Sequence, residues 1–413
     1  MKTWLDISPN SDFSIHNLPF GIFSVDGSPK RIGMAIGEVV IDLVRALELG
    51  VITDNTLTIA ELENEYLNDF IALGKNVTHS VRMKVQKSLC DDQSLLKDSS
   101  ALISMGDVTM HLPVKIGDYT DFYSSIEHAT NVGKMFRDPE NALLPNWKHL
   151  PVGYHGRSSS IIVSGTDIHR PKGQTKPPEG NPVYGPSSRM DFELEMGFII
   201  GKATHLGDQI TTENAMDHIF GMVLFNDWSA RDIQKWEYVP LGPFLGKSFA
   251  SSISPWVVTM EALEPFQVDG PTQNPPVLDY LNSDAKNYNI NLTVEIEPEG
   301  SESTVVSTSN FKYMYWNMAQ QLAHHTVNGC NVNVGDMMAS GTISGKSPDS
   351  FGSMLELSWA GKNPVPLNDG SERTFLQDGD TVSMKGHCEK EGIRVGFGEV
   401  RSCLLYTSDV ADE

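Results

Sequence analysis

Cysteine is scarce in this sequence, and long apolar runs are absent from it. The 413 residues include 4 cysteines, which lie far apart and form no CxxC pair. Neither a disulfide framework nor a zinc site is therefore indicated. No stretch approaches about 18 consecutive apolar residues, the length that a membrane-spanning helix needs. Residues 1–6 lack the apolar core of a signal peptide. We therefore expect a soluble protein of the cytoplasm.

Basic residues are also few. Lys and Arg number 31 against 53 Asp and Glu, which gives a formal net charge of −22 at pH 7. A surface this acidic repels phosphate backbones and anionic lipid, so we expect no nucleic-acid partner and no membrane partner. The acid excess is uneven, because residues 257–310 carry nine acidic residues and one basic residue, whereas residues 113–160 carry five of each.

The chain is long enough for two domains at roughly 100–200 residues per domain. Residues 1–112 contain short strand-like pieces and a helical stretch around 57–73. After about residue 113, short apolar runs recur between Gly and Pro clusters, a pattern typical of a β-sandwich or barrel. We expect strands at 160–163, 192–200, 221–225, 255–258, 291–297, 351–359 and 382–384, and helices at 228–236 and 311–327.

Several acidic residues lie where a carboxylate needs a partner. Glu193 and Glu195 are two apart in an apolar run, so a strand would place both on one face. That pattern fits a solvated strand face as well as a cation site. Asp227 follows another apolar run, and a turn contains Asp118 and Asp121. Three or four oxygen donors without a Cys partner favour Ca²⁺ or Mg²⁺ over zinc.

Asp227 is also suited to cap the helix expected at 228–236. Arg231 and Gln234 follow at the fourth and seventh positions, so such a helix would place all three on one face. The spacing fits an Asp–Arg surface pair, and it equally fits a carboxylate on a metal with cationic and amide donors facing an anionic ligand.

Three further residues are candidates for buried polar roles. The loop ending in Lys247 imitates a phosphate-binding loop but is one residue short of that motif, so we predict a buried cation and no nucleotide site. His128 follows the Asp-rich turn, and a catalytic His needs an orienting partner. Glu356 lies in an apolar run and must be paired if buried. Sequence alone does not bring His128 and Glu356 together.

Around these residues the chain resembles the fumarylacetoacetate hydrolase family. The resemblance runs from about Ser11 to Gly398. It is carried by long motifs, which lie at 116–125, 128–133, 146–147, 151–157, 226–232, 236–249, 340–345 and 350–359.

The resemblance implies a mainly β (α+β) fold. A small N-terminal SH3-like barrel is expected at 1–112 and a mixed β-sandwich roll at 113–402, in a homodimer. It also implies metal-dependent hydrolysis of a carbon–carbon bond in a dicarboxylic 1,3-diketone, 4-fumarylacetoacetate, to fumarate and acetoacetate, the last step of tyrosine and phenylalanine catabolism. The alternatives are an acylpyruvate hydrolase or decarboxylase of the same superfamily, or an inactive calcium-binding homologue.

The same resemblance assigns roles to individual residues. The general base would be His128, held by Glu356. The oxyanion-stabilising groups would be Arg231, Gln234 and Lys247. The substrate pocket would be lined by Tyr123, Arg137, Tyr154, Tyr238 and Thr342. The ion-binding set, for Ca²⁺ or Mg²⁺, would be Asp121, Glu193, Glu195 and Asp227, extended by Lys247, Ala250 and Ser251.

Two segments depart from the family's pattern. Ala250 and Ser251 replace an expected Gly-Thr, although Ser keeps a hydroxyl and the backbone oxygens are unchanged. Residues 403–413 do not resemble the family's C-terminus, so we expect this tail to be non-native.

Overall fold

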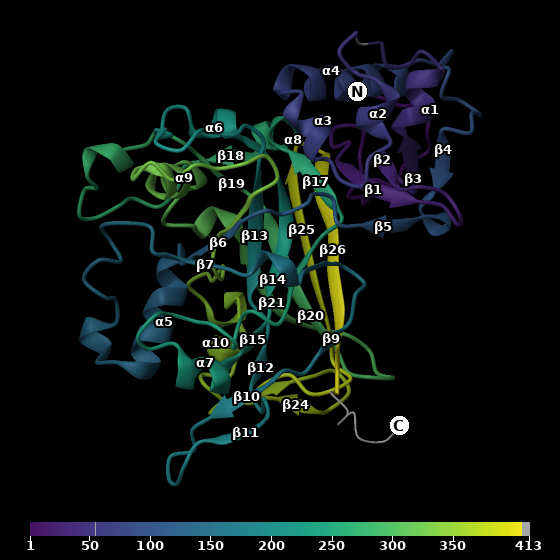
Figure 1. Ribbon diagram of the computed structural model, residues 1–413. Coiled ribbons are helices and arrows are strands. Elements are labelled where there is room, and N and C mark those ends of the chain that lie inside the picture. The colour runs from purple at the N-terminus through teal and green to yellow at the C-terminus, as the bar shows by residue number, and fades with distance from the viewer. Residues whose placement is uncertain (54, 407–413) are drawn as a thin grey trace.

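The computed structural model describes residues 1–53 and 55–406. Within them, one sheet has 13 strands, a second has 5, and shorter ribbons have 2 strands each. Figure 1 shows the N-terminal strands and helices at one end of a larger body built from the two main sheets. The predicted mainly β fold with added helices is confirmed.

The N-terminal strands lie in the order β5-β1-β2-β3-β4, and the 3-10 turn η1 (Met105–Asp107) links β4 to β5. Part of the apolar core of this sheet is shared with the second half, because β1 also pairs with β17 and the Phe20 and Phe220 rings lie 6.0 Å apart. The strands are β1 (Phe20–Ser24), β2 (Arg31–Ile36), β3 (Val39–Asp42), β4 (Leu102–Ser104) and β5 (Thr109–His111).

Four helices lie between β3 and β4, and they correct the single helix expected at 57–73. That stretch forms two short helices. Thr58 caps the first in a capping box with Glu61, and this helix ends after one turn, where the Glu63 N–H donates to the Ile59 carbonyl oxygen. The helices are α1 (Leu43–Glu48), α2 (Ile59–Leu62), α3 (Asn68–Ala72) and α4 (Lys75–Leu89).

The large sheet continues through the second half in the order β17-β14-β13-β22-β6-β7, and β16 and β8 branch from β14. Its central strands are buried on both faces, as expected for near-continuous apolar runs. The strands are β6 (Tyr119–Phe122), β7 (Gly153–His155), β8 (Ile161–Val163), β13 (Leu194–Ile200), β14 (Ile219–Asp227), β16 (Ser251–Ile253), β17 (Trp256–Thr259) and β22 (Met337–Ala339).

The second sheet, β21-β20-β25-β26-β9, packs against the first (Figure 1). The packing is tight: a Cβ added at Gly386 of β25 would lie 2.9 Å from the Leu224 side chain of β14. Alternate residues of β20 are buried, the pattern of a strand with one face on a core. The strands are β9 (Ile168–His169), β20 (Asn291–Glu297), β21 (Thr304–Asn310), β25 (Thr381–Lys390) and β26 (Ile393–Leu405).

Shorter elements surround these sheets. The paired ribbons are β10 (Lys172–Thr175) with β11 (Val183–Pro186), β12 (Met190–Asp191) with β15 (Ser229–Ala230), β18 (Gln267–Val268) with β19 (Asn287–Tyr288), and β23 (Val365–Pro366) with β24 (Glu372–Arg373). The α-helices are α5 (Ile126–Phe136), α6 (Ala215–His218), α7 (Arg231–Glu237), α8 (Met260–Leu263), α9 (Met318–Thr326) and α10 (Met354–Leu357). None of the helices in the described ranges has the length and apolarity needed to cross a bilayer.

Three expected elements differ from the structure. The helix predicted at 228–236 begins at Arg231, because Ser229 and Ala230 are held in β15 by pairing with β12. The helix predicted at 311–327 is a 3-10 turn followed by α9, which Asn317 caps. The strand predicted at 351–359 contains the helix α10, because Ser353 caps the Glu356 N–H.

The expected C-terminal tail begins inside the fold. Cys403–Leu405 are the end of β26 and pair with β25 and β9. The remainder of the tail prediction, at 407–413, lies outside the described residues.

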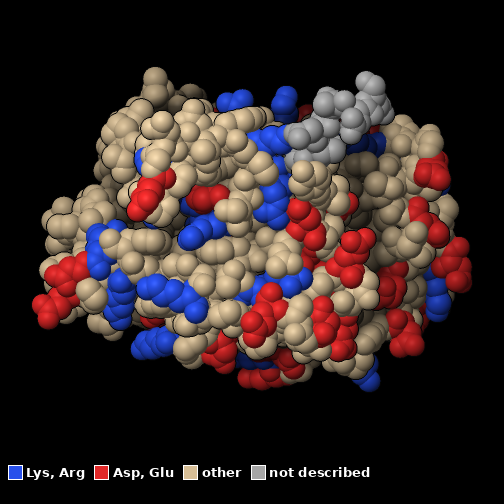
Figure 2. All heavy atoms as spheres, turned by 90° about the horizontal axis from the view of Figure 1, so that it is seen from below, with Lys and Arg blue, Asp and Glu red and all other residues tan. Residues whose placement is uncertain are grey.

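Charge is distributed unevenly over the surface. Figure 2 views the end of the molecule farthest from the N-terminal sheet, where basic side chains gather on one side and acidic ones crowd the other. The net charge of −22 therefore does not describe every face of the protein.

Candidate active site

Four acidic side chains meet within the large sheet. Asp121 lies on β6, Glu193 directly precedes β13, Glu195 lies in β13, and Asp227 ends β14. All four are buried, and each offers an oxygen within 4.8 Å of the others. Neighbouring strands hold them together, because β22 pairs with both β6 and β13 and β13 pairs with β14. The exposed Asp118, expected to add a donor, is not in this cluster.

A glycine allows the cluster to close. Gly341 has a φ of 76°, and a Cβ there would lie 2.2 Å from the Phe122 carbonyl oxygen. This backbone conformation favours glycine. The Gly341 N–H donates to Glu195 Oε2 at 3.0 Å.

Two of the four carboxylates each have one oxygen without a donor among the described residues. Asp121 Oδ1 and Glu195 Oε1 are buried and receive no hydrogen bond from the described residues. Burial, and then the neighbouring carboxylates, raise the pKa of both groups well above the usual range. Such oxygens are costly to bury, and hard oxygen donors are what Ca²⁺ and Mg²⁺ bind. The donor set therefore fits a divalent cation.

The other two carboxylates have cationic partners. Lys247 Nζ contacts Glu193 and lies 2.7 Å from Asp227 Oδ2, and Arg231 lies 2.7 Å from Glu193 Oε1. Burial opposes ionisation of Glu193, but Lys247 and then Arg231 outweigh it and hold the pKa of that carboxyl below its usual value. Lys247 is thus the predicted buried cation. Its ammonium has no lone pair, so in this arrangement it is a counter-ion to the cluster.

Asp227 is oriented by two hydroxyl groups. Ser251 Oγ donates to its Oδ1 at 2.9 Å, and the Tyr154 hydroxyl donates to its Oδ2 at 3.0 Å. Ser251 opens β16, which pairs with β14 so that Ser251 faces Asp227. Ala250, the preceding residue, is buried. The structure therefore brings Tyr154, Ala250 and Ser251 to the carboxylate cluster or its immediate border.

His128 and Glu356, 228 residues apart, form a buried pair. His128 Nδ1 lies 2.7 Å from Glu356 Oε2. Nε2 of the same ring has no partner in the described part of the chain. Ser125 caps α5 by accepting the His128 N–H, and the Tyr123 ring packs edge-on against the imidazole at 5.3 Å. His128 lies near enough to Glu193 to lower the pKa of that carboxyl, so the pair borders the cluster.

Glu356 is fully supplied with donors. Besides His128, it accepts hydrogen bonds from Asn131, Ser344 and Ser353 at 2.8–3.0 Å. Burial opposes its ionisation, but His128 and these hydrogen bonds lower the pKa of Glu356 below its usual value. Sequence reasoning missed all three donors. The spacing of Asn131, three residues after His128 on a helix, was a signal that could have found one of them.

The predicted helical face of Asp227, Arg231 and Gln234 does not form, because Asp227 lies on a strand. Arg231 instead contacts Asp191 at 2.8 Å and Glu193. Its Nη1 also donates to Gln234 Oε1 at 3.2 Å, while its Nη2 is buried without a partner in the described chain. Asp191 was not found from the sequence.

The remaining pocket residues divide into two groups. Thr342 is buried next to Gly341, and its Oγ1 has no partner among the described residues. Arg137 and Tyr238 are exposed, and Arg137 donates to the Ala142 carbonyl oxygen at 2.7 Å. No contact joins Arg137 or Tyr238 to the cluster in the described structure.

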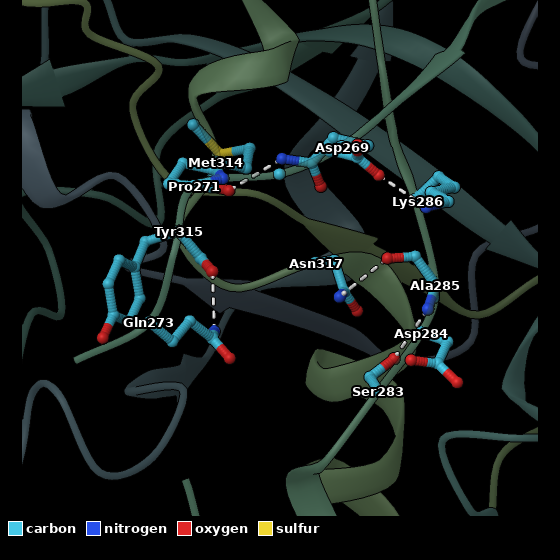
Figure 3. Close-up of a pocket in the computed structure, with 12 residues that line it drawn as sticks. Asp269, Pro271, Gln273, Ser283, Asp284, Ala285, Lys286, Met314, Tyr315 and Asn317 are labelled. Carbon is cyan, nitrogen blue, oxygen red and sulfur yellow. Dashed lines mark hydrogen bonds and ion pairs between the residues drawn. The ribbon is translucent and has the colours of Figure 1, made fainter. Parts of the chain in front are cut away.

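A separate cavity lies away from these residues. It has a volume of about 250 Å³ and contains none of the predicted site residues. Figure 3 shows it bordered by polar groups of Asp269, Ser283, Lys286 and Asn317. The predicted site residues that contact one another therefore do so at or beside the carboxylate cluster and not at this cavity.

Family models match nearly the whole chain. Residues 16–113 match the fumarylacetoacetase N-terminal model, and residues 118–404 match the fumarylacetoacetate hydrolase C-terminal model. The chain belongs to the fumarylacetoacetate hydrolase family. The resemblance seen in the sequence is confirmed.

Curated members of this family match over their full length. The chain is 53% identical to fumarylacetoacetase of Homo sapiens over 98% of both chains. It is 53% identical to that of Caenorhabditis elegans, over 98% of this chain and 99% of the relative. It is 50% identical to that of Arabidopsis thaliana, over 96% and 97%.

Solved structures share the fold at lower identity. A fumarylacetoacetate hydrolase from Exiguobacterium antarcticum aligns with a TM-score of 0.55 at 18% identity, covering 94% of this chain and all of that one. A 2-hydroxyhepta-2,4-diene-1,7-dioate isomerase from Mycobacterium marinum aligns with a TM-score of 0.50 at 14% identity, covering 95% and 100%. Because these two proteins are named for different reactions, the fold alone does not select one.

Proposed function

We propose that this chain hydrolyses the carbon–carbon bond of 4-fumarylacetoacetate to fumarate and acetoacetate, the last step of tyrosine and phenylalanine catabolism. The observation that carries the proposal is the buried His128–Glu356 pair beside a cluster of four carboxylates in which two oxygens have no donor among the described residues. The choice of substrate is supported by full-length relatives named fumarylacetoacetase.

The proposed cofactor is Ca²⁺, with Mg²⁺ as the second candidate. It would be held by Asp121, Glu193, Glu195 and Asp227. Ala250 and Ser251 extend this proposed ion-binding set, whereas the Lys247 ammonium has no lone pair and serves as a counter-ion to the carboxylates. When bound, the cation supplies Lewis-acid polarisation of the diketone oxygens.

His128 is the proposed general base. Glu356 on Nδ1 fixes the imidazole orientation, so Nε2 is directed to accept a proton from water, and the carboxylate stabilises the imidazolium that this transfer creates. The water oxygen bonds to the carbonyl carbon as its proton passes to Nε2. The carbon–carbon bond then breaks, its electron pair leaves on the acetoacetate carbon, and that carbon takes up a proton.

Donors around this pair are proposed to stabilise the charge that develops. The unpartnered Nη2 of Arg231 is buried and free to donate, with Gln234 and Lys247 beside it. Each well-placed donor to an oxyanion is worth about 3 kcal/mol. Substrate carboxylates and carbonyls would be received by the pocket residues, Tyr123, Arg137, Tyr154, Tyr238 and Thr342.

We also propose a homodimer in the cytoplasm. The four cysteines are free, as expected in a reducing compartment. Apolar side chains stand exposed between Trp236 and Leu245, with Leu241 96% exposed, and exposed apolar groups of this kind mark contact surfaces. Light scattering of the purified protein tests the dimer, and a monomer mass at micromolar concentration contradicts it.

The direct test is loss of the ultraviolet absorbance of fumarylacetoacetate with purified protein and supplied Ca²⁺ or Mg²⁺. We expect turnover that ends when the cation is chelated. Absence of turnover with either cation refutes the proposal. An acylpyruvate assayed in parallel is the control, because faster cleavage of that substrate would favour the acylpyruvate hydrolase alternative.

A further inference from the structure

Asp191 is a buried carboxylate that no proposed chemical step uses. It ends β12, which pairs with β15 so that Asp191 lies opposite Ser229. Its side chain is fully buried. Figure 1 places β12 and β15 beside α7 and α10, the helices that carry Arg231 and Glu356.

The Asp191 carboxylate binds both of those helices at once. Oδ1 accepts the Met354 N–H at 2.7 Å, and Oδ2 accepts the Leu355 N–H at 3.0 Å. Oδ2 also accepts Nε of Arg231 at 2.8 Å. Met354 and Leu355 are the first two residues of α10, so their N–H groups have no partner within that helix.

Arg231 is held from two sides by this arrangement. Asp191 binds Nε, and Glu193 binds Nη1. The planar guanidinium is thereby fixed, and Nη2 is left buried without a partner in the described chain. The direction in which the Nη2 group of Arg231 points is therefore fixed by Asp191 as well as by Glu193.

The other branch leads to the general base. Asp191 fixes the first turn of α10, Glu356 is the third residue of that helix, and Glu356 in turn holds His128. The Asp191 carboxylate thus links Arg231 on α7 to Glu356 on α10, which orients the proposed base. Arg231 and Glu356 are 125 positions apart in the sequence.

We infer that Asp191 is a positioning residue that sets Arg231 and the His128–Glu356 pair in register with each other. The inference rests on the proposed roles of Arg231 and Glu356. Misplacement of catalytic groups by about 1 Å can cost about 100-fold in rate. Loss of Asp191 should therefore act on kcat through both branches, while substrate affinity changes little.

The test is Asp191→Asn, which keeps the shape but removes the charge. We expect kcat to fall about 10–100-fold with KM within about twofold. Asp191→Glu is the second variant. It keeps the negative charge but lengthens the side chain, so kcat should again fall. This variant carries the test if Asp191→Asn does not fold.

Asp380→Asn is the matched control. Asp380 is equally buried, pairs with Arg373 at 2.8 and 2.9 Å and accepts the Gln377 N–H, all outside the site. It should lower the urea midpoint as Asp191→Asn does but leave kcat unchanged. An equal loss of kcat in both variants would show a merely structural role and overturn the inference.

Double variants separate the two branches. Asp191→Asn combined with Arg231→Lys, and with Glu356→Gln, should each lose less than the product of the single losses, because both changes disturb the same placement. Multiplicative losses in both pairs overturn the inference.

Failure of the proposed function is recognised separately. A wild-type protein without turnover, or full kcat in Arg231→Lys and Glu356→Gln, overturns the inference together with the roles on which it rests. Loss of kcat in those two variants but not in Asp191→Asn overturns the role of Asp191 alone.

Discussion

Glu356 and the four-carboxylate cluster are both buried, but their oxygens differ in the hydrogen-bond donors that they receive. Glu356 has donors on both oxygens, and its pKa is lowered by His128 and hydrogen bonds in spite of burial. Asp121 and Glu195 have oxygens without donors, and burial and neighbouring carboxylates raise their pKa. The difference teaches that burial alone does not make two carboxylates alike, because the donors around each one set its hydrogen bonding and the direction of its pKa shift.

In the proposed mechanism Glu356 orients His128, and the sharpest test removes the proposed base. His128→Gln should lower kcat about 10²–10⁴-fold, because proton abstraction from water loses its acceptor. Initial rates with saturating cation measure this. His111→Gln is the control and should keep full activity. His111 lies in the N-terminal sheet, where its ring is hydrogen-bonded to the Ser24 hydroxyl. Equal activity of both variants would contradict the role of His128.

A change at Asp121, which has an oxygen without a donor, should weaken cation binding more than a change at Glu356. Asp121→Asn should weaken Ca²⁺ binding by at least about 100-fold, since even partners of metal ligands contribute about 10–100-fold. Isothermal titration calorimetry measures the affinity. Glu356→Gln is the control within the comparison and should bind Ca²⁺ with wild-type affinity. A similar loss in both variants would break the distinction between the two groups.

Stability should respond to the cation through the same cluster. A ligand at 100 times its dissociation constant stabilises the folded state by about 2.7 kcal/mol, so Ca²⁺ should raise the free energy of unfolding of the wild type by that amount. Urea titrations with and without Ca²⁺ measure it. Asp121→Asn should lose most of this gain, and an undiminished gain in that variant would place the cation elsewhere.

The contribution of Glu356 to the free energy of unfolding should depend on pH in the acid range. The pKa of Glu356 is lowered in the fold, so its contribution to stability is present above the unfolded value of about 4.3 and is lost as pH falls through the folded pKa. The stability difference between wild type and Glu356→Gln should be about 1–3 kcal/mol near neutrality and should shrink below about pH 4.3. Urea unfolding at several pH values measures it, and a difference that grows on acidification would contradict it.

Much of the fold was predictable from local pattern. The short apolar runs at 192–200, 221–225 and 291–297 correctly predicted the strands β13, β14 and β20, because the side chains that a sheet buries are apolar. Helix boundaries were less accurate. Arg231 rather than Trp228 begins α7, and 351–359 contains a helix instead of a strand, because strand pairing and a Ser cap overrode the local pattern.

By itself, the sequence determined the residue types of the site and, through its long motifs, the family. Carboxylates in apolar runs, a His after an acidic turn and a Lys in a tight loop all pointed to buried polar chemistry. Only the tertiary structure decided the pairings: His128 with Glu356, Lys247 with Asp227, and Asp191 with both Arg231 and α10. The physical reason is that such contacts join residues up to 228 positions apart, and their formation depends on strand order and helix placement, which no local spacing encodes.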